Sequence, residues 1–580
     1  MEPAVSEKPG TRDGLAAQGE ALIGAAPVTG PVVGPSTAPN GFPPSIPVDT
    51  ITFTDWSQYV VVESVQIARV SSAADVAAVC NWAAQNSFTV RAMGEGHNWS
   101  PILLVPGTPP NSKVMLVDTT KLVSCSFQLL DRVPLATFGT GITIDAASAY
   151  LQTLENGGTS AAPGFAFPHA TAPGNLTLGG ILAIGGHGTL VPSGTGSGTG
   201  EEALMGCLSN LIMGFDAVVT EPDGPNSTSY AVRHFERTET DAAAFLVHLG
   251  RAFLTSVTLR VVPNYYLQLH CLFPKATDLF APPSTAPSNP SAFANLLDTY
   301  GRVEVLWFPY NLHTFAQCNM LQTTAIEPQV AGPYNYPWMN DITPLKNKLI
   351  KAGLFAFPKT TPVFTAGELA LTQAHLDGKV LNGTARDLEI YLKDTTLRVA
   401  LFGWALQVPR GDVQQVVNLF FEKVKAMLDA AETAGTYPIN AAMEIRCTTI
   451  DRPGVLPTPA LAATHSVAPH DPTLDTVVWL NVGTVTGTPG SNAFYTELET
   501  WLLTTWGQTE PNRLRPEWSK GWAYTASGPW TNPTVLQAVK AAYNQPGGDA
   551  LTLKWAASTL ASYDQANIFT NALLGNIFST

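Results

Sequence analysis

The order of apolar and polar residues predicts a strand–helix–strand unit where the packed part of the chain begins. Residues 65–69 alternate with the period of two that a half-buried strand shows. Ser72 stands where a helix N-cap belongs, and from Val76 onward apolar residues recur at i, i+3, i+4 and i+7, which is one face of a helix. An apolar run at residues 88–90 predicts the second strand, which leads directly into a turn that contains glycine.

The same patterns divide the rest of the chain. Further strands are expected at residues 114–117, 136–143, 211–219, 255–262, 302–309, 442–448 and 476–482. Helices are expected at residues 146–154 and 412–433. We therefore expect a Pro/Gly/Ala-rich arm at 1–48, a first domain at 49–266, an inserted domain at 267–503, and a C-terminal segment at 504–580 that returns to the first domain.

The turn after the second predicted strand carries candidate chemistry in the run R-A-M-G-E-G-H-N-W-S at residues 91–100. Its two glycines let the backbone approach a ligand closely, and their N–H groups can face an anion such as a pyrophosphate. A Rossmann fingerprint needs a third glycine that opens a helix, but Ser100 and Pro101 stand there. Two interpretations of this loop stay open: a tight turn with an ordinary hydrogen-bonded histidine, and a flavin pyrophosphate loop in which His97 joins the flavin.

A second glycine cluster follows a helix-breaking proline, at residues 174–180 and 185–189. Such a density of glycine indicates either a loop crossing or a backbone packed against something flat. This cluster alone does not choose between the two.

Charge and cysteine content narrow the class of protein. Charged residues make up only 13% of the 580, and the net charge of −14 argues against nucleic acid and anionic membrane surfaces as partners. The six cysteines form no C-x-x-C pair, so we expect buried free thiols, with one long-range disulfide as the alternative, and no metal site. No apolar run reaches the length that spans a membrane, and no signal peptide is visible.

In chain order, these motifs resemble the vanillyl-alcohol oxidase superfamily of flavoproteins, and within it the bacterial cholesterol oxidases with covalently bound flavin. The run from Arg91 to His97 is similar to the family's first pyrophosphate loop, and residues 174–189 are similar to its second flavin segment. Residues 249–261 are similar to the part that closes the flavin domain. The resemblance covers about residues 50–580.

The second half of the chain carries the remaining motifs of the resemblance. Glu444 and Arg446 are similar to the family's E-x-R pair, and residues 515–520 to its W-x-K segment beside the flavin. Residues 563–569 resemble its closing Y-D-P…I-F, with Gln565 in place of the proline. Sugar-lactone oxidases carry a histidine where this chain has Glu517, which argues against a sugar substrate.

The resemblance implies an α+β fold with an FAD-binding domain of two α+β subdomains and an inserted substrate domain whose antiparallel sheet covers the flavin ring. It implies FAD that is covalently bound through His97, with His187 as the rival attachment point. The residues expected to contact the cofactor are Arg91, Gly94, Glu95, Gly96, His97, Asn98, Ser100, Gly174, Asn175, Gly179, Gly180, Gly185, Gly186, His187, Gly188, Val257 and Lys520.

Five side chains are expected to act on an alcohol substrate. Glu444 and Arg446 share one face of a predicted strand, which suits a base and a cation that stabilises developing negative charge; the alternative is a surface ion pair. Lys520 is expected beside the flavin, or else exposed. Glu304 is expected to serve the base or a steroid isomerisation, or else to face water at a sheet edge. Asn481 is expected to hydrogen-bond the substrate hydroxyl, or else to bridge backbone groups.

For function, the resemblance implies oxidation of the 3β-hydroxyl of cholesterol and related sterols, isomerisation to the 4-en-3-one, and reduction of O2 to hydrogen peroxide. An apolar cavity is expected to be lined by Trp307, Phe308, Tyr310, Tyr334, Tyr336 and Trp338. The alternatives are a polyol or sugar-lactone oxidase, a flavin-binding carrier without turnover, and a dehydrogenase that passes electrons to a partner. A secreted monomer is implied, with transient contact to sterol-bearing membranes and no nucleic-acid partner.

Overall fold

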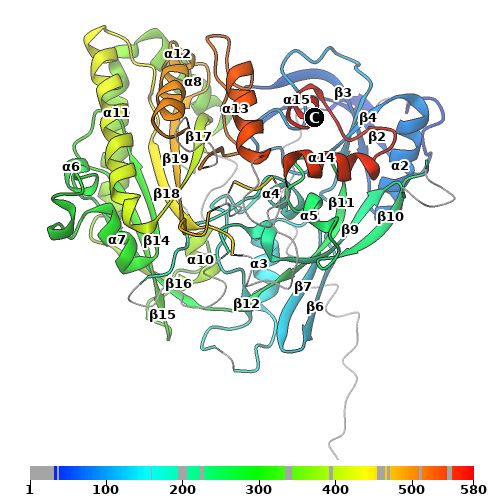
Figure 1. Ribbon diagram of the computed structural model, residues 1–580, viewed down its shortest axis with the longest axis horizontal. Helices are drawn as coiled ribbons and strands as arrows, with labels where there is room; N and C mark the ends of the chain where they lie inside the picture. Colours follow the sequence, from blue (N-terminus) through cyan, green and yellow to red (C-terminus); the bar gives the residue numbers. More distant parts are fainter. Residues whose placement is uncertain are drawn as a thin grey trace, which may run out of the picture.

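A computed structural model describes residues 32–35, 38–158, 160–193, 205–221, 228–333, 342–390, 396–452, 464–466, 471–507, 513–544 and 552–579. Figure 1 shows the largest sheet on one side of the molecule and the two sheets of the N-terminal half on the other. All six cysteines are free thiols, and five of them are buried, as expected. None of the helices in the described ranges is long and apolar enough to cross a bilayer.

The first sheet contains the expected strand–helix–strand unit. Its order is β1–β2–β3–β5–β4, with β1 (Val32–Pro35), β2 (Val48–Thr54), β3 (Val61–Arg69), β4 (Thr89–Met93) and β5 (Val114–Asp118). Helix α2 (Ala73–Asn86) connects β3 to β4, and both strands pair with β5 in parallel. A capping box formed by Ser72 and Asp75 begins α2. Because β4 ends at Met93, the glycine loop begins at the carboxyl end of a strand.

The second sheet is antiparallel and packs beneath the second glycine cluster. Its order is β10–β9–β11–β7–β6, with β6 (Cys125–Leu130), β7 (Val133–Gly139), β9 (Ile212–Val219), β10 (Ala231–Glu236) and β11 (Leu254–Arg260). A pair of short strands, β8 (Phe165–Ala166) and β12 (Val262–Pro263), lies beside it. The helical elements of this part are α3 (Ile144–Gln152), α4 (Leu178–Ala183), η2 (Leu208–Leu211) and α5 (Ala242–Leu246).

Two of the strands expected here are shorter than predicted. The strand expected at 136–143 ends at Gly139, since Gly139 and Gly141 lie against the backbone of residues 119–123, where a Cβ would come within 2.3 Å and 1.7 Å of carbonyl oxygens. Thr143 instead caps α3. The strand expected at 255–262 divides into β11 and β12, because its last residues leave the second, five-stranded sheet and pair with β8.

The third sheet has eight strands in the order β16–β13–β15–β14–β18–β19–β17–β20, and all its neighbours are antiparallel. Its strands are β13 (Tyr266–Leu272), β14 (Arg302–Trp307), β15 (Phe315–Gln322), β16 (Val380–Thr384), β17 (Val399–Val408), β18 (Met443–Thr449), β19 (Thr476–Val485) and β20 (Leu514–Pro516). Helices α7 (Phe293–Tyr300), α11 (Val413–Thr433) and α12 (Ser491–Leu502) cover one face with apolar side chains. Figure 1 shows α7 and α11 along that outer side.

The other face of this sheet is turned toward the N-terminal half and carries polar side chains at its centre. The register places Glu444 opposite Asn481 and Arg446 opposite Glu304, and cross-strand partners share a face. The remaining elements of this region are α6 (Ala276–Leu279), η3 (Ala286–Ser288), α8 (Pro344–Ala356), η4 (Pro358–Thr360), α9 (Thr361–Leu376), α10 (Ala385–Glu389), η5 (Arg410–Asp412) and the π-helical turn η7 (Leu503–Gly507).

The aromatic cavity lining was predicted wrongly at Trp307. Its side chain lies on the helix-covered face, where its ring centre is 5.0 Å from that of Phe421. Phe308 is buried in a cluster on the other side, and Tyr310 lies beside Tyr437. Period-two alternation could not assign the faces because both faces of this strand are covered. Tyr334, Tyr336 and Trp338 lie outside the described residues.

The C-terminal segment expected at 504–580 is divided between the two halves of the molecule. Strand β20 pairs with β17 and so extends the eight-stranded sheet. Helices α13 (Pro533–Asn544), α14 (Leu553–Ser562) and α15 (Ala572–Ile577) follow (Figure 1), and the segment between α14 and α15 lies beside β4. There the Val90 N–H donates to the carbonyl of Ile568.

Candidate active site

A cavity lies between the two glycine clusters and the polar face of the eight-stranded sheet. Most of the residues predicted to contact the cofactor line it, namely Arg91, Gly94, Glu95, Gly96, His97, Asn98, Gly179, Gly180, Gly185, Gly186, His187 and Lys520. Trp518, the tryptophan of the W-x-K segment, also lines it, and so does Trp479, which the sequence did not single out. The structure therefore brings together segments that are more than 400 residues apart in the chain.

Five of the predicted cofactor residues do not line this cavity in the described structure. Val257 packs into the core beneath it, and Gly174 is pressed against the side chain of Ile390. Gly188 borders a small neighbouring pocket and donates its N–H to His169. Ser100 and Asn175 are set back from the cavity wall, and each has a buried side-chain oxygen with no hydrogen-bond partner among the described residues.

Arg91 lines the cavity but its guanidinium holds the protein together. Its Nη1 donates to the carbonyl of Gly250 at 2.7 Å, and its Nη2 donates to that of Ile102 at 2.6 Å. Burial, together with the positive charge of Arg251, lowers the pKa of Arg91 to about 9. The side chain thus fixes the glycine loop to two other segments, which explains why an arginine precedes the glycines.

His97 is buried at the cavity wall with a neutral imidazole ring, which is the form that can act as a nucleophile. Its ring stacks on Trp56 with ring centres 4.6 Å apart, and neither ring nitrogen has a hydrogen-bond partner among the described residues. Burial, and then the positive charges of Arg398 and Lys520, hold the pKa of His97 well below its ordinary value, so the ring is neutral. A neutral imidazole has a lone pair available for bonding to carbon.

His187, the rival attachment point, is engaged on both ring nitrogens. Its Nδ1 lies 3.0 Å from the carbonyl oxygen of Gly188, and its Nε2 lies 3.7 Å from Glu517 Oε1. The ring also stacks on Trp479 at 3.6 Å. These contacts hold the His187 ring in place, whereas the ring nitrogens of His97 have no partner among the described residues.

The glycines of the second cluster leave room that no other residue would leave. At Gly185, where φ is +68°, a Cβ would lie 2.2 Å from His465 Cδ2. Gly185→Ala is expected to destabilise the fold by about 1–3 kcal/mol and to reduce the flavin content of the purified protein. Thermal unfolding and the ratio of protein to flavin absorbance measure both effects. Gly367→Ala, inside helix α9 where a Cβ meets open space, is the matched control and should lower neither the stability nor the flavin content.

The residues that line the cavity fit a flavin dinucleotide. Two loops bring glycine backbone to its wall, and the buried ring nitrogens of His97 and the hydroxyl of Thr171 have no partner among the described residues. Buried polar atoms are normally hydrogen-bonded, so a polar ligand is expected to complete them.

Four charged side chains meet at the sheet end of the cavity; three of them line it, and Glu444 lies behind Arg446. Arg446 Nε lies 3.1 Å from Glu444 Oε1, and Arg446 Nη2 lies 3.6 Å from Glu517 Oε1. Lys520 Nζ lies 3.8 Å from Glu517 Oε1 and 3.8 Å from the centre of the Trp99 ring. The two carboxylates and the two cations balance in charge, which lets the group be buried.

Neighbouring charges keep both carboxylates ionised. Burial raises the pKa of Glu444. The charges of Arg446 and Lys520 and a hydrogen bond with Glu304 together lower it by more, so the pKa lies below its ordinary value. Burial likewise raises the pKa of Glu517, while Lys520, His187 and Arg446 lower it far more. Glu444 and Glu304 share a hydrogen bond, and two carboxyl groups can do so only when one of them holds a proton.

Asn481 was predicted to hydrogen-bond the substrate hydroxyl, but both ends of its amide are engaged by charged side chains. Arg446 Nη2 donates to its amide oxygen at 3.0 Å, and its amide nitrogen donates to Glu517 Oε2 at 2.7 Å. Asn481 is therefore a bridge that orients Arg446 and Glu517. Glu517 is the site residue that the sequence did not identify; its only signal was that it replaced a histidine in the W-x-K segment.

Glu304, predicted as a second carboxylate, lies next to the charged group on the polar face of the sheet. It borders a small pocket together with Arg446, Gln317 and Glu389. Gln317 Nε2 donates to Glu304 Oε2 at 3.4 Å. The residue thus faces the interior on the polar side of the sheet and not water at an edge.

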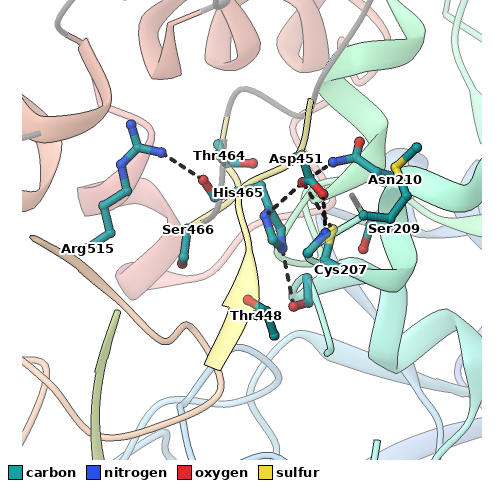
Figure 2. Close-up of polar contacts among 12 residues, drawn as sticks. Cys207, Ser209, Asn210, Thr448, Asp451, Thr464, His465, Ser466 and Arg515 are labelled. Carbon is teal, nitrogen blue, oxygen red and sulfur yellow. Dashed lines mark hydrogen bonds and ion pairs between the residues drawn. The ribbon is translucent and has the colours of Figure 1, made fainter. Parts of the chain in front are cut away.

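Behind the cavity, a buried network fastens the second glycine cluster to the C-terminal part of the chain (Figure 2). His465 Nδ1 lies 3.5 Å from Asp451 Oδ2, and Cys207 Sγ donates to the same oxygen at 3.6 Å. His465 Nε2 lies 3.3 Å from the carbonyl of Gly185. The neighbouring backbone carbonyls of Thr464 and His465 accept hydrogen bonds from Trp518 Nε1 and Arg515 Nη1.

The same network has the donor atoms of a metal site. The ligand atoms of Cys207, Asp451 and His465 lie within 4.8 Å of one another, and the sequence had not predicted such a group. Burial raises the pKa of Asp451 to about 7 and lowers that of His465 to about 3. Asp451 also accepts hydrogen bonds from the Gly206 N–H and Asn210 Nδ2, so its oxygens are already engaged by protein groups.

Comparison with known families decides the identity of this arrangement. The family model for the cholesterol oxidase substrate-binding domain matches residues 271–579, which is more than half of the chain, and the model for an FAD-binding domain matches residues 65–198. The chain belongs to the cholesterol oxidase family. The resemblance and the two-domain flavoprotein fold expected from the sequence are thereby confirmed.

Solved structures agree with membership of the cholesterol oxidase family. A solvent-stable cholesterol oxidase is 33% identical, with a TM-score of 0.85 over 94% of this chain and 100% of that chain. The crystal structure of cholesterol oxidase from B. sterolicum is 27% identical, with the same TM-score and coverage. A chitooligosaccharide oxidase, 12% identical with a TM-score of 0.52 over 89% of this chain and 93% of that chain, shares the fold. Comparison with curated protein sequences gave no match.

Proposed function

We propose that this chain oxidises the 3β-hydroxyl of cholesterol and related sterols with FAD, reduces O2 to hydrogen peroxide, and moves the ring double bond to give the 4-en-3-one. The observation that carries the proposal is the buried group of Arg446, Glu517 and Lys520, which lines the same cavity as the flavin loops, with Glu444 paired to Arg446 beside it. The names of the similar cholesterol oxidases support the choice of substrate.

The residues divide the work of alcohol oxidation between a base and cations. FAD, when bound, supplies the acceptor for the carbinol hydride. Glu444 takes the hydroxyl proton, since its pKa lies below its ordinary value and it is ionised at neutral pH. Arg446 and Lys520 stabilise the negative charge that develops on the substrate oxygen, in a site from which bulk water is largely excluded. Asn481 and Glu517 hold Arg446 in place.

The isomerisation needs a group that removes a ring proton and returns it at a different carbon. The hydroxyl proton leaves with hydrogen peroxide, so Glu304 and Glu444 again share one proton. When Glu444 holds that proton, Glu304 is the carboxylate that can take the ring proton from the adjoining pocket. One proton can therefore pass between the two carboxyl groups without reaching solvent. In the same proposal His97 carries the flavin through its unpaired ring nitrogen.

Arg446→Met is expected to move the acid limb of the kcat/KM pH profile upward by about 1–3 pH units. The Arg446 cation lowers the pKa of Glu444, so removing it raises that pKa, and the base is then protonated at a higher pH. As the pH falls, activity should be lost earlier than in the wild type. An acid limb that stays in place would contradict the assignment of Glu444 as the base.

The test of the proposed function is aerobic incubation with cholesterol dispersed in detergent, with hydrogen peroxide and the conjugated enone followed together. Parallel formation of both supports oxidation and isomerisation. If hydrogen peroxide forms without the enone, the chain is not an isomerase and the role proposed for Glu304 is wrong. If a flavin-loaded protein forms neither, the sterol assignment is wrong, and polyols and sugar lactones become the substrates to screen.

A further inference from the structure

Helices α8 and α9 lie on the same face of the eight-stranded sheet as the active-site residues. Side chains two apart on a strand, and directly paired across strands, share a face. By this register Val399 and Val485 share the face of Asn481, while Leu269 and Phe315 share the face of Glu304. Both helices pack against these side chains, and they therefore roof the part of the polar face that the flavin loops leave uncovered.

The inner sides of the two helices are apolar and buried. Leu354 of α8 packs in a cluster with Val399 and Val485. Leu369 and Leu376 of α9 pack in a cluster with Leu269 and Phe315. This burial accounts for the attachment of the helices to the sheet, but it does not account for the apolar residues on their outer sides.

The outer sides carry large apolar side chains that face solvent. Leu345 and Leu349 are 67% and 64% exposed and lie one helical turn apart on α8. Phe357, at the junction of the helices, is 67% exposed, and Val363 of α9 is 74% exposed. Scattered exposed apolar residues are ordinary, but these occupy one short segment, together with Leu371.

The charge of this segment is opposite to that of the whole protein. Residues 344–376 contain four lysines and one acidic residue, Glu368, whereas the chain carries a net charge of −14. Glu368 is buried, and this burial raises the pKa of its carboxyl well above its ordinary value, so the exposed charges of the segment are those of the lysines. Lys346, Lys348 and Lys359 are exposed beside the apolar side chains. The net charge of the whole chain argues against binding to anionic surfaces, whereas this segment carries an excess of positive charge.

We propose that this α8–α9 surface, defined by Leu345, Leu349, Phe357, Val363 and Leu371 with Lys346, Lys348 and Lys359, docks on the anionic headgroup surface of a lipid bilayer. Apolar side chains flanked by lysines are the composition of an interfacial segment that inserts at the headgroup level. The proposal rests on the proposed function, because a sterol resides in bilayers. The inner sides of the same helices roof the face that carries Glu444, so a sterol that leaves the bilayer there would reach the site beneath apolar cover.

The test measures binding of the full-length, flavin-loaded protein to sterol-free vesicles of phosphatidylcholine with roughly one third phosphatidylglycerol. Leu349→Asp/Phe357→Asp and Lys346→Glu/Lys348→Glu are each expected to weaken vesicle binding by about tenfold or more. The matched controls are Leu129→Asp/Leu130→Asp, at positions that are 63% and 56% exposed on β6, and Lys425→Glu on α11. These controls should bind as the wild type does. Added salt should weaken binding of the wild type more than that of the lysine variant.

Turnover separates this inference from the proposed function. With cholesterol in detergent micelles, the surface variants should keep the wild-type kcat/KM, and with cholesterol in vesicles they should lose it in parallel with binding. Absence of turnover in micelles by the wild type would remove the proposed function, while the sterol-free vesicles still test docking. The inference is overturned if the wild type does not bind these vesicles, if the controls lose as much binding as the surface variants, or if gel filtration shows that the surface instead joins two copies of the chain.

Discussion

Glu444→Gln is expected to lower kcat for sterol oxidation by about 100- to 10,000-fold. Glutamine keeps the size of the side chain and can still accept a hydrogen bond from Arg446, but it cannot take the hydroxyl proton. Glu517 is already paired with Arg446 and Lys520, and Glu304 lies in the adjoining pocket, so neither carboxyl group takes the place of Glu444 beside Arg446 Nε. Stopped-flow measurement of flavin reduction by cholesterol isolates the affected step.

The control for this experiment is Glu497→Gln, which removes a carboxylate that is 62% exposed and pairs with Lys423 on the outer helices. It should reduce the flavin at the wild-type rate. The flavin spectrum of Glu444→Gln should match that of the wild type, which separates a missing base from a damaged site. A rate of flavin reduction within about threefold of the wild type would assign the proton transfer to another group.

The second large effect is expected from His97→Ala, which should abolish covalent attachment of the flavin. After acid precipitation, the wild type should keep its yellow colour in the pellet, and the variant should release all of it to the supernatant. The reason is that the neutral ring of His97 has both nitrogens unpaired among the described residues, at the wall of the flavin cavity.

His187→Ala is the matched comparison for the covalent link. Both nitrogens of His187 already face protein oxygens, so this variant should keep the flavin in the pellet. If His187→Ala released the flavin and His97→Ala retained it, the attachment point would be reversed. If both variants and the wild type released it, the flavin would be held without a covalent bond.

Contacts between residues that are close together in the chain could be predicted from the sequence. Contacts between residues that only the fold brings together could not. The spacing of Glu444 and Arg446 on one predicted strand was enough to expect an ion pair, and the structure contains it. Asn481 was predicted to meet the substrate, but its position opposite Glu444 depends on the pairing of two strands, and that register engages its amide with Arg446 and Glu517.

The location of the glycines at the cavity was predicted more accurately than the contacts of the residues around them. The two clusters predicted loops at a ligand, and most of their glycines line the cavity. No sequence pattern indicates that Arg91 donates hydrogen bonds to the carbonyls of Ile102 and Gly250, since Gly250 is distant in the chain. The charge of the whole chain was likewise a poor guide to the surface of α8 and α9, because net charge averages over faces that contact different surroundings.

The hydrogen bond between Val90 and Ile568 has a consequence for biosynthesis. The first glycine loop also depends on the carbonyl of Ser519, which accepts hydrogen bonds from the N–H groups of Trp99 and Ser100. On the ribosome these partners emerge more than 400 residues after the loop itself, although N-terminal domains usually fold first. The nascent chain therefore cannot complete its cofactor loop until those residues have been translated, and loading of the flavin is expected to wait for them.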